Sequence, residues 1–131
     1  MMSVSSLRLR WFAAVFATTL VWAGPGTERL LNLSSRGWVG SGSEVLVAGF
    51  VIGPGEAKQV LIRGIGPTLA DYGVAGVLAN PELRLYDGAN QLIATNDNWG
   101  PDASATFGEV GAFALPAGSQ DAAMVVTLEP G

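Results

Sequence analysis

Side chains that carry oxygen ligands gather in one polar stretch of the sequence, between residues 87 and 102. The set consists of Asp87, Asn90, Asn96, Asp97, Asn98 and Asp102. Calcium prefers such carboxylate and amide oxygens, and extracellular modules often bind this ion weakly. Asp and Asn also form turns without any metal, and the spacing here does not match an EF-hand loop. The candidate calcium site is therefore Asp87, Asn90, Asn96, Asp97 and Asp102, with simple turn formation as the alternative.

Two tryptophans are candidate ligand contacts. Trp99 lies in the same polar stretch, between Asn98 and Gly100, and Trp38 lies closer to the N-terminus. A loop tryptophan can stack on a sugar ring or anchor a protein partner. Trp99 could equally cover the edge of a hydrophobic core, since a large aromatic side chain usually buries most of its surface. The sequence leaves both interpretations open.

The residue types give little support to catalysis. The sequence contains no histidine and no cysteine, which excludes Ser-His-Asp and Cys-His nucleophile systems and zinc sites built on imidazole or thiolate. A pair of carboxylates could in principle hydrolyse a glycoside, and Asp71, Asp97 and Asp102 are the candidates. These acids lie in expected loops, where Asp usually forms turns or surface charge. We therefore expect no enzymatic activity and no catalytic residues.

The elements that position these residues are expected to be strands. Short apolar runs alternate with turn residues, and no long stretch keeps a helical period. The run 44–52 is apolar on both faces, as in a central strand, and we expect a hairpin between it and 58–64. Residues 82–87 and 91–96 form the clearest hairpin, and 121–129 is the last strand. The chain is therefore predicted to be all-β.

The N-terminal segment has the layout of a secretory signal peptide. Arg8 and Arg10 precede the apolar run 11–23, which ends in the small residue Ala23. The run has 13 residues, whereas a membrane-spanning helix needs about 18 or more. We expect residues 1–23 to be a signal-peptide helix that is removed on export, with no stable membrane span afterwards. The protein is then secreted, periplasmic or displayed on the cell surface.

The remaining residues, 24–131, have the size of one domain. They keep five basic and eleven acidic residues, for a net charge of −6. The basic residues are dispersed, so the electrostatic surface of a nucleic-acid-binding protein is missing. Without cysteines, the domain depends on its hydrophobic core for stability. We expect a single antiparallel β-sandwich, jelly-roll-like in its arrangement, and no nucleic acid as partner.

The last residues, Pro130 and Gly131, follow the strongly apolar run 121–129. Pro-Gly is a turn signal and favours a partner strand after it. A final strand without its partner has an open edge, which is a known route to self-association. The module is therefore expected to be incomplete at its C-terminus. The alternative is a natural terminus that Pro130 and Gly131 simply blunt.

Several strand and turn motifs resemble a known type of module. They are Leu83 to Gly88, Leu92 to Ala94 with Asn96 and Asp97, Leu115 to Ser119, and Val126 to Gly131. These motifs resemble the bacterial pre-peptidase C-terminal type of β-sandwich. The stretch 31–131 is similar to a repeated module of large secreted bacterial proteins, through Asn32 to Gly37 and Val60 to Pro67. The resemblance implies a further strand after the final Pro-Gly and an accessory role beside a catalytic, adhesive or surface-display region.

Two functions follow as expectations. The first is a non-catalytic, exported structural or interaction module of a secreted or cell-surface bacterial protein, whose partners are other proteins or neighbouring repeat modules. The second is a carbohydrate-binding or calcium-dependent binding module that accompanies a secreted enzyme. In the second case Trp38 or Trp99 would contact a glycan, and calcium would be the only cofactor.

Overall fold

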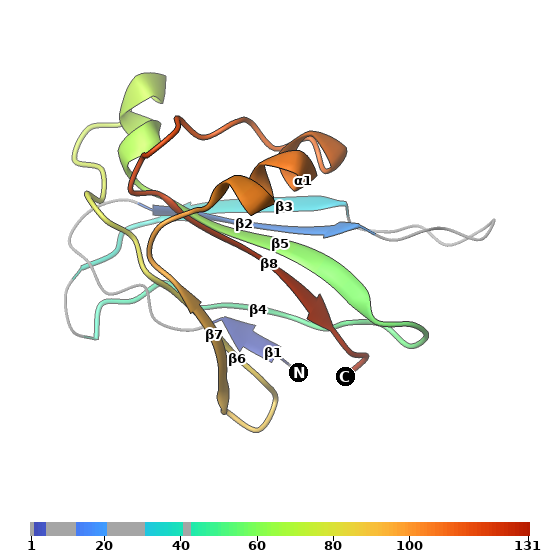
Figure 1. Cartoon of the computed structure of the whole chain (residues 1–131). Coiled ribbons are helices and arrows are strands. Elements are labelled where there is room, and N and C mark those ends of the chain that lie inside the picture. Colours follow the sequence, from blue (N-terminus) through green and yellow to red (C-terminus); the bar gives the residue numbers. More distant parts are fainter. Residues whose placement is uncertain (1, 5–12, 21–30, 41–42) are drawn as a thin grey trace.

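Strands dominate the structure, a computed structural model that describes residues 2–4, 13–20, 31–40 and 43–131 (Figure 1). The strands are β1 (Met2–Val4), β2 (Ala13–Leu20), β3 (Asn32–Gly37), β4 (Ala48–Phe50), β5 (Lys58–Ile65), β6 (Leu83–Tyr86), β7 (Leu92–Asn96) and β8 (Ala122–Leu128). The helical segments are short: η1 (Pro67–Tyr72), η2 (Pro101–Ala103) and α1 (Ser104–Glu109). None of the helices in these described ranges has the length and apolar character that crossing a membrane requires. The predicted small all-β chain agrees with this content.

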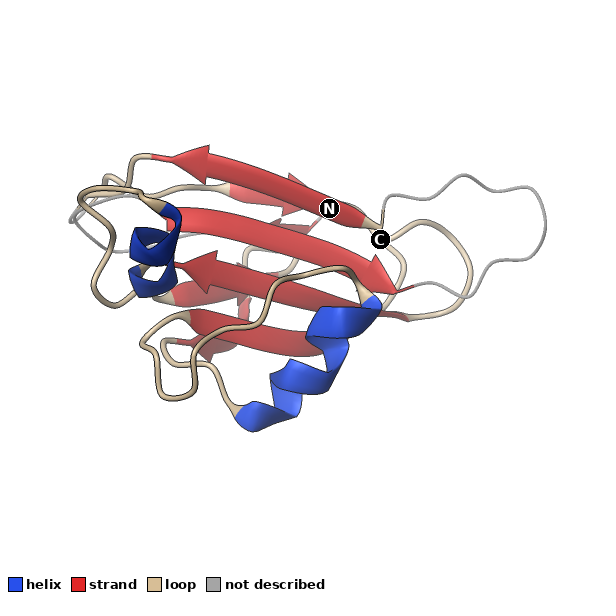
Figure 2. Ribbon diagram, turned by 90° about the horizontal axis from the view of Figure 1, so that it is seen from above, coloured by secondary structure: helices blue, strands red, loops and turns tan. Residues whose placement is uncertain are grey.

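The strands of the described residues form two four-stranded sheets, in the orders β4-β1-β6-β7 and β3-β2-β5-β8. Every pairing is antiparallel. Figure 1 shows the sheets as two layers, with η1 and α1 above the β3-β2-β5-β8 sheet. Figure 2 looks onto that outer face, which the helices partly cover. β7 and β8 are edge strands, and they lie at the same side of the two layers.

The alternation of side chains along β5 explains why it contributes to two hydrophobic clusters. Val60 and Ile62 pack with Leu83 and Leu85 of β6, between the sheets. The next residues along the strand point the other way, so that Leu61 packs with residues of η1 and α1 on the outer face. A strand that is covered on both faces needs apolar side chains at consecutive positions. In this chain β5 is that strand.

The predicted hairpin between 44–52 and 58–64 is wrong, because β4 and β5 lie in different sheets. The first run forms a strand only at Ala48–Phe50, whereas the predicted strand in the second run is confirmed as β5. Apolar residues on both faces suggested a covered strand, yet Val47 and Val51 remain 55% and 64% exposed. The predicted hairpin at 82–96 is confirmed as β6 and β7, and the predicted last strand is confirmed as β8.

The predicted signal peptide overlaps a strand. Residues 13–20 form β2, which pairs with β3 on one side and β5 on the other, whereas a signal-peptide helix is expected there from the sequence. One Val, one Phe and two Thr make up half of this segment, and these residue types favour strands. The remainder of the predicted signal peptide is described only at β1, and positions 1, 5–12 and 21–23 lie outside the described residues. Cleavage and export stay predictions.

Candidate binding groove and the buried polar cluster

The start of β8 is held by a buried carboxylate. Asp121 is 0% exposed and precedes β8 directly. Its Oδ1 accepts hydrogen bonds from the backbone N–H groups of Gly66 (2.7 Å) and Thr68 (3.3 Å). Its Oδ2 accepts from the hydroxyls of Thr68 and Ser119 (2.7 Å for Ser119). A buried carboxylate is tolerated when donors satisfy it in this way, so this set, the Asp121 cluster, joins β8 to the turn after β5.

Arg63 of β5 lies next to the Asp121 cluster and is also fully buried. Its guanidinium carbon lies 4.6 Å from the ring centroid of Phe107 and 4.5 Å from that of Phe113. These are cation–π distances, and such contacts strengthen when water is excluded. Burial lowers the pKa of Arg63 to about 10, while the nearby Asp121 and Tyr72 act in the opposite direction. Arg63 and the Asp121 cluster are therefore part of the packed interior.

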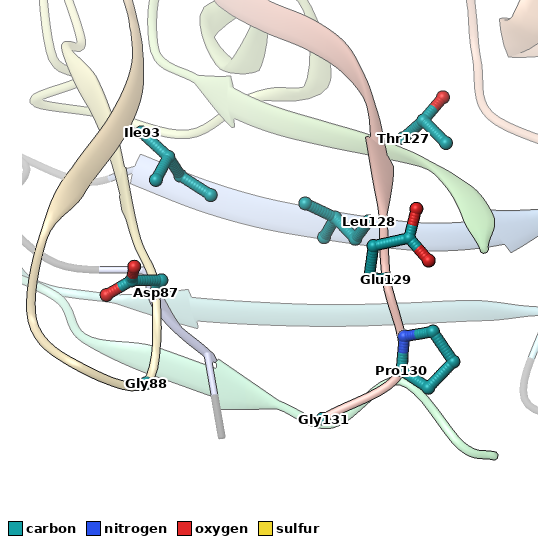
Figure 3. A pocket seen from close by; sticks show the side chains of 8 residues that line it. All are labelled: Asp87, Gly88, Ile93, Thr127, Leu128, Glu129, Pro130 and Gly131. Atoms are coloured by element: carbon teal, nitrogen blue, oxygen red, sulfur yellow. The ribbon is translucent and has the colours of Figure 1, made fainter.

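The other end of β8 borders an open groove of about 470 Å³. One wall comes from the β6–β7 hairpin and the other from the end of β8 and the residues after it. The lining residues are Asp87, Gly88, Ile93, Thr127, Leu128, Glu129, Pro130 and Gly131. In Figure 3, Ile93 and Leu128 extend toward each other from the two walls, and each wall carries one carboxylate. We call this surface the acidic groove.

The hairpin wall of the acidic groove is shaped by Asp87. Its Oδ1 accepts hydrogen bonds from the N–H groups of Ala89 (2.9 Å) and Gln91 (2.8 Å). The Asp87 N–H also donates to the Gln91 carbonyl at 2.9 Å, and Asn90 adopts a left-handed conformation with φ 61°. Asp and Asn fit these positions because Asp accepts from following amides and Asn tolerates positive φ. The turn therefore fixes the start of β7, and with it the position of the exposed Ile93 side chain.

The wall formed by the end of β8 is fixed at the last residue. The Gly131 N–H donates to the Ile52 carbonyl at 3.1 Å, which ties the end of the chain to the segment after β4. Leu128 is only 5% exposed and belongs to the cluster between the sheets, whereas Ile93 across the groove is 45% exposed. The acidic groove therefore has one buried apolar wall and one accessible apolar wall.

β8 also has an open backbone edge beside the acidic groove. Successive residues of a strand direct their N–H and C=O groups to alternate sides. At the start of β8 two of the groups that point away from β5 are occupied: the Asp121 carbonyl accepts from the Trp99 N–H (2.8 Å), and the Ala123 N–H donates to Asn96 Oδ1 (2.9 Å). By the same alternation, Val125 and Thr127 direct their backbone groups away from β5. Across the described residues, no hydrogen bond satisfies those groups.

The predicted calcium ligands fall into two groups at opposite ends of β7. Asp87 and Asn90 lie in the turn before the strand, and Asn96, Asp97 and Asp102 lie at or after its end. A strand of this length spans about 15 Å. Asn96 is already engaged by the Ala123 N–H and donates to the Asn98 carbonyl at 2.8 Å. The described residues contain no group of three or more acidic side chains placed to hold a metal ion, and calcium binding stays a prediction.

The two tryptophans lie at opposite edges of one sheet. Trp99 packs against Phe107 with 5.7 Å between ring centroids, and its indole N–H donates to Ser119 Oγ at 3.0 Å. It thereby covers the cluster under the helices, as one of the two interpretations expects. Trp38 follows β3 at the far edge and is 57% exposed. A single ligand that contacts both side chains is not consistent with this placement.

The sequence pattern places Asp121, Glu129 and Ile93 in or beside strands and predicts no role for them. The position of Asp121 directly before an apolar run is the only local signal that it accepts hydrogen bonds in the interior. No local pattern joins Glu129 and Ile93, because the groove that they line forms only where two sheet edges come together in the folded chain. In comparisons with known proteins, no family model, curated protein or solved structure matches this chain significantly.

Proposed function

We propose that this chain is an exported, non-catalytic β-sandwich module that binds other polypeptides in a secreted or cell-surface bacterial assembly. The observation that carries the proposal is the open edge of β8 beside the acidic groove. An exposed strand edge is a template for pairing with another chain, and proteins normally cover such an edge unless it is used. The two-layer arrangement of antiparallel sheets supports a sandwich fold.

The residue chemistry supports a binding role over a catalytic one. Without histidine or cysteine, the most frequent general base and thiol nucleophiles are missing from the chain. The loop acids that could serve a glycosidase lie on separate segments: Asp71 in η1, Asp97 after β7 and Asp102 in η2. Two carboxylates must flank one bond to hydrolyse a glycoside. Activity that survives in an Asp97→Asn, Asp102→Asn double variant would exclude this pair.

The proposed export can be tested directly, because cleavage after residue 23 would remove β2, which lies within residues 1–23. If residues 1–23 are removed, β3 and β5 lose the strand between them. The full chain would be expressed in a bacterial host, and the intact mass of the protein in the periplasm and medium would be compared with that in the cytoplasm. We expect the exported form to begin at Gly24. A full-length chain found only in the cytoplasm would refute export.

A matched variant separates export from folding. Val15→Asp places a charge in the apolar run that a signal peptide requires, and it also lies in β2. Ser35→Asp changes the residue paired with Val15 in β3 and leaves the apolar run intact. Loss of export with Val15→Asp but not with Ser35→Asp supports a signal peptide. Equal retention of both variants in the cytoplasm points to a folding defect.

A second candidate is a carbohydrate-binding or calcium-dependent module, and the exposure of Trp38 favours it. An indole that is 57% exposed offers a face for a sugar ring. Binding to a glycan array, with and without calcium, would be compared for the wild type, Trp38→Ala and Leu31→Ala. Leu31 is the matched control, because it is equally exposed near the same strand. Glycan binding that only Trp38→Ala removes would favour this function.

A further inference from the structure

We propose that the open part of β8 and the acidic groove bind an extended peptide segment of another protein, one in which a cationic side chain lies next to apolar ones. The inference rests on the proposed function, because it names the partner of the same surface. The segment would add as a strand beside β8 and place its side chains over the groove.

The backbone of β8 supplies the first part of the binding site. Val125 and Thr127 direct one N–H and one C=O group each away from β5, toward the open side. Water satisfies these groups in the free protein, and a peptide in extended conformation would replace it with regular hydrogen bonds. The usable edge is short, because the Asp121 carbonyl and the Ala123 N–H are already bonded to Trp99 and Asn96. A bound segment therefore lies along the second half of β8.

The acidic groove supplies the second part, which selects side chains. Ile93 and Leu128 line it with apolar surface from its two walls, and alternate residues of an added strand would cover that surface (Figure 3). Asp87 and Glu129 add one carboxylate on each wall, and the lining residues include no basic side chain. Negative potential at a binding surface favours a cationic partner group. The charge of the whole chain, −4, acts in the same direction.

A second copy of this chain fits the surface less well. A symmetric pair of β8 strands centred on Val125 would need the edge at Ala123 in both copies, and Asn96 already occupies it. Together with the two carboxylates of the acidic groove, this feature favours a different, cationic chain as the occupant.

The test uses the full chain and a set of fluorescein-labelled peptides of seven residues. Valine and threonine alternate in each peptide, and one lysine occupies each position in turn. Fluorescence anisotropy at low salt is expected to give saturable binding for at least one lysine position. Replacing that lysine by glutamate should abolish binding, and N-methylation of alternate backbone amides should reduce it by at least about tenfold. Increasing salt should weaken it.

Two pairs of variants locate the binding surface on the protein. Thr127→Pro removes an N–H that points away from β5 and leaves the bonds to β5 in place, so we expect binding to fall by about tenfold. Thr127→Ala keeps that N–H and serves as its control. Glu129→Gln should weaken binding by about two- to fivefold. Glu56→Gln, an exposed acid in the loop before β5, is the matched control for charge.

Thermal unfolding of each variant confirms that it folds. The inference is overturned if no peptide binds, if the N-methylated peptides bind as well as the others, or if Thr127→Pro and Thr127→Ala have the same effect. It is also overturned if sedimentation shows a dimer of the wild type that Thr127→Pro dissociates, because the occupant is then a second copy. Failure of export refutes the proposed function and leaves these peptide measurements unaffected.

Discussion

The removal of the Asp121 carboxylate is expected to have the largest effect of any single change considered for this chain. In Asp121→Ala, the buried N–H groups of Gly66 and Thr68 lose their acceptor, and so do the hydroxyls of Thr68 and Ser119. A buried donor without an acceptor costs about 1–3 kcal/mol, and four donors depend on Asp121. Arg63 also loses the anion that opposes its desolvation. We expect a loss of about 3–5 kcal/mol in the free energy of unfolding.

Urea unfolding followed by tryptophan fluorescence measures this loss, because Trp99 contacts the Asp121 cluster through Ser119. With a slope of about 2 kcal/mol per molar urea, the midpoint should fall by about 2 M. Asp97→Ala, an exposed acid nearby, should change the free energy by less than about 0.5 kcal/mol. Asp121→Asn keeps one acceptor oxygen for the two N–H groups and should cost less than alanine. A loss below about 1 kcal/mol for Asp121→Ala would refute the reasoning.

Three further predictions concern other buried or constrained positions. Gly66→Ala should destabilise the protein by more than about 2 kcal/mol, because its Cβ would lie 2.2 Å from the Leu78 carbonyl oxygen. The control Gly100→Ala should cost little, because its Cβ would meet nothing within 4 Å, and thermal unfolding compares the two variants. Asn90→Val should cost about 1–2 kcal/mol at φ 61° and Asn90→Gly should be near neutral, as urea midpoints will show. Burial lowers the pKa of Arg63 to about 10 in the folded protein, so above that pH the folded state loses a proton that the unfolded state keeps. As the pH rises from 10, the free energy of unfolding of the wild type should therefore increase relative to that of Arg63→Met. A difference between these two proteins that stays constant between pH 9 and 11 would contradict the last prediction.

The sequence predicted the elements whose patterns are local. The alternation of Leu83 and Leu85 with polar neighbours, followed by Asp and Gly, was sufficient for the hairpin, and both leucines are fully or almost fully buried. β5 and β8 were predicted from continuous apolar runs instead, because both faces of these strands are covered: in β5, Ile62 packs between the sheets and Leu61 packs under the helices. In each case the pattern follows the contacts of the strand directly.

The pattern fails where burial depends on distant parts of the chain. Residues 44–52 and 58–64 have similar composition, but only the second run lies between a sheet and a layer of helices. The short helix α1 was not predicted, because its six residues show too little periodicity. Phe107 within it and Val110 after it belong to the cluster with residues of β5 and β8. Only the assembled fold decides which of two equally apolar runs becomes the covered one.

The candidate site was harder to predict for a related reason. The polar residues 87–102 attracted attention as metal ligands, yet Asp87 and Asn96 both accept hydrogen bonds from backbone amides. The acidic groove instead combines Asp87 with Glu129, which are far apart in the sequence and come together because β7 and β8 are edge strands on the same side of the two sheets. No spacing rule joins them.

The two ends of β8 differ in a way that limits how this open edge can be used. An uncovered strand edge promotes unselective pairing, and proteins counter it by covering part of the edge or by placing charges beside it. Here Asn96 and Trp99 cover the first half, through hydrogen bonds to Ala123 and Asp121. The second half is uncovered but lies beside Glu129, so a strand that pairs there must tolerate a nearby carboxylate. If the edge is used as proposed, these two features restrict it to short segments that carry a positive charge.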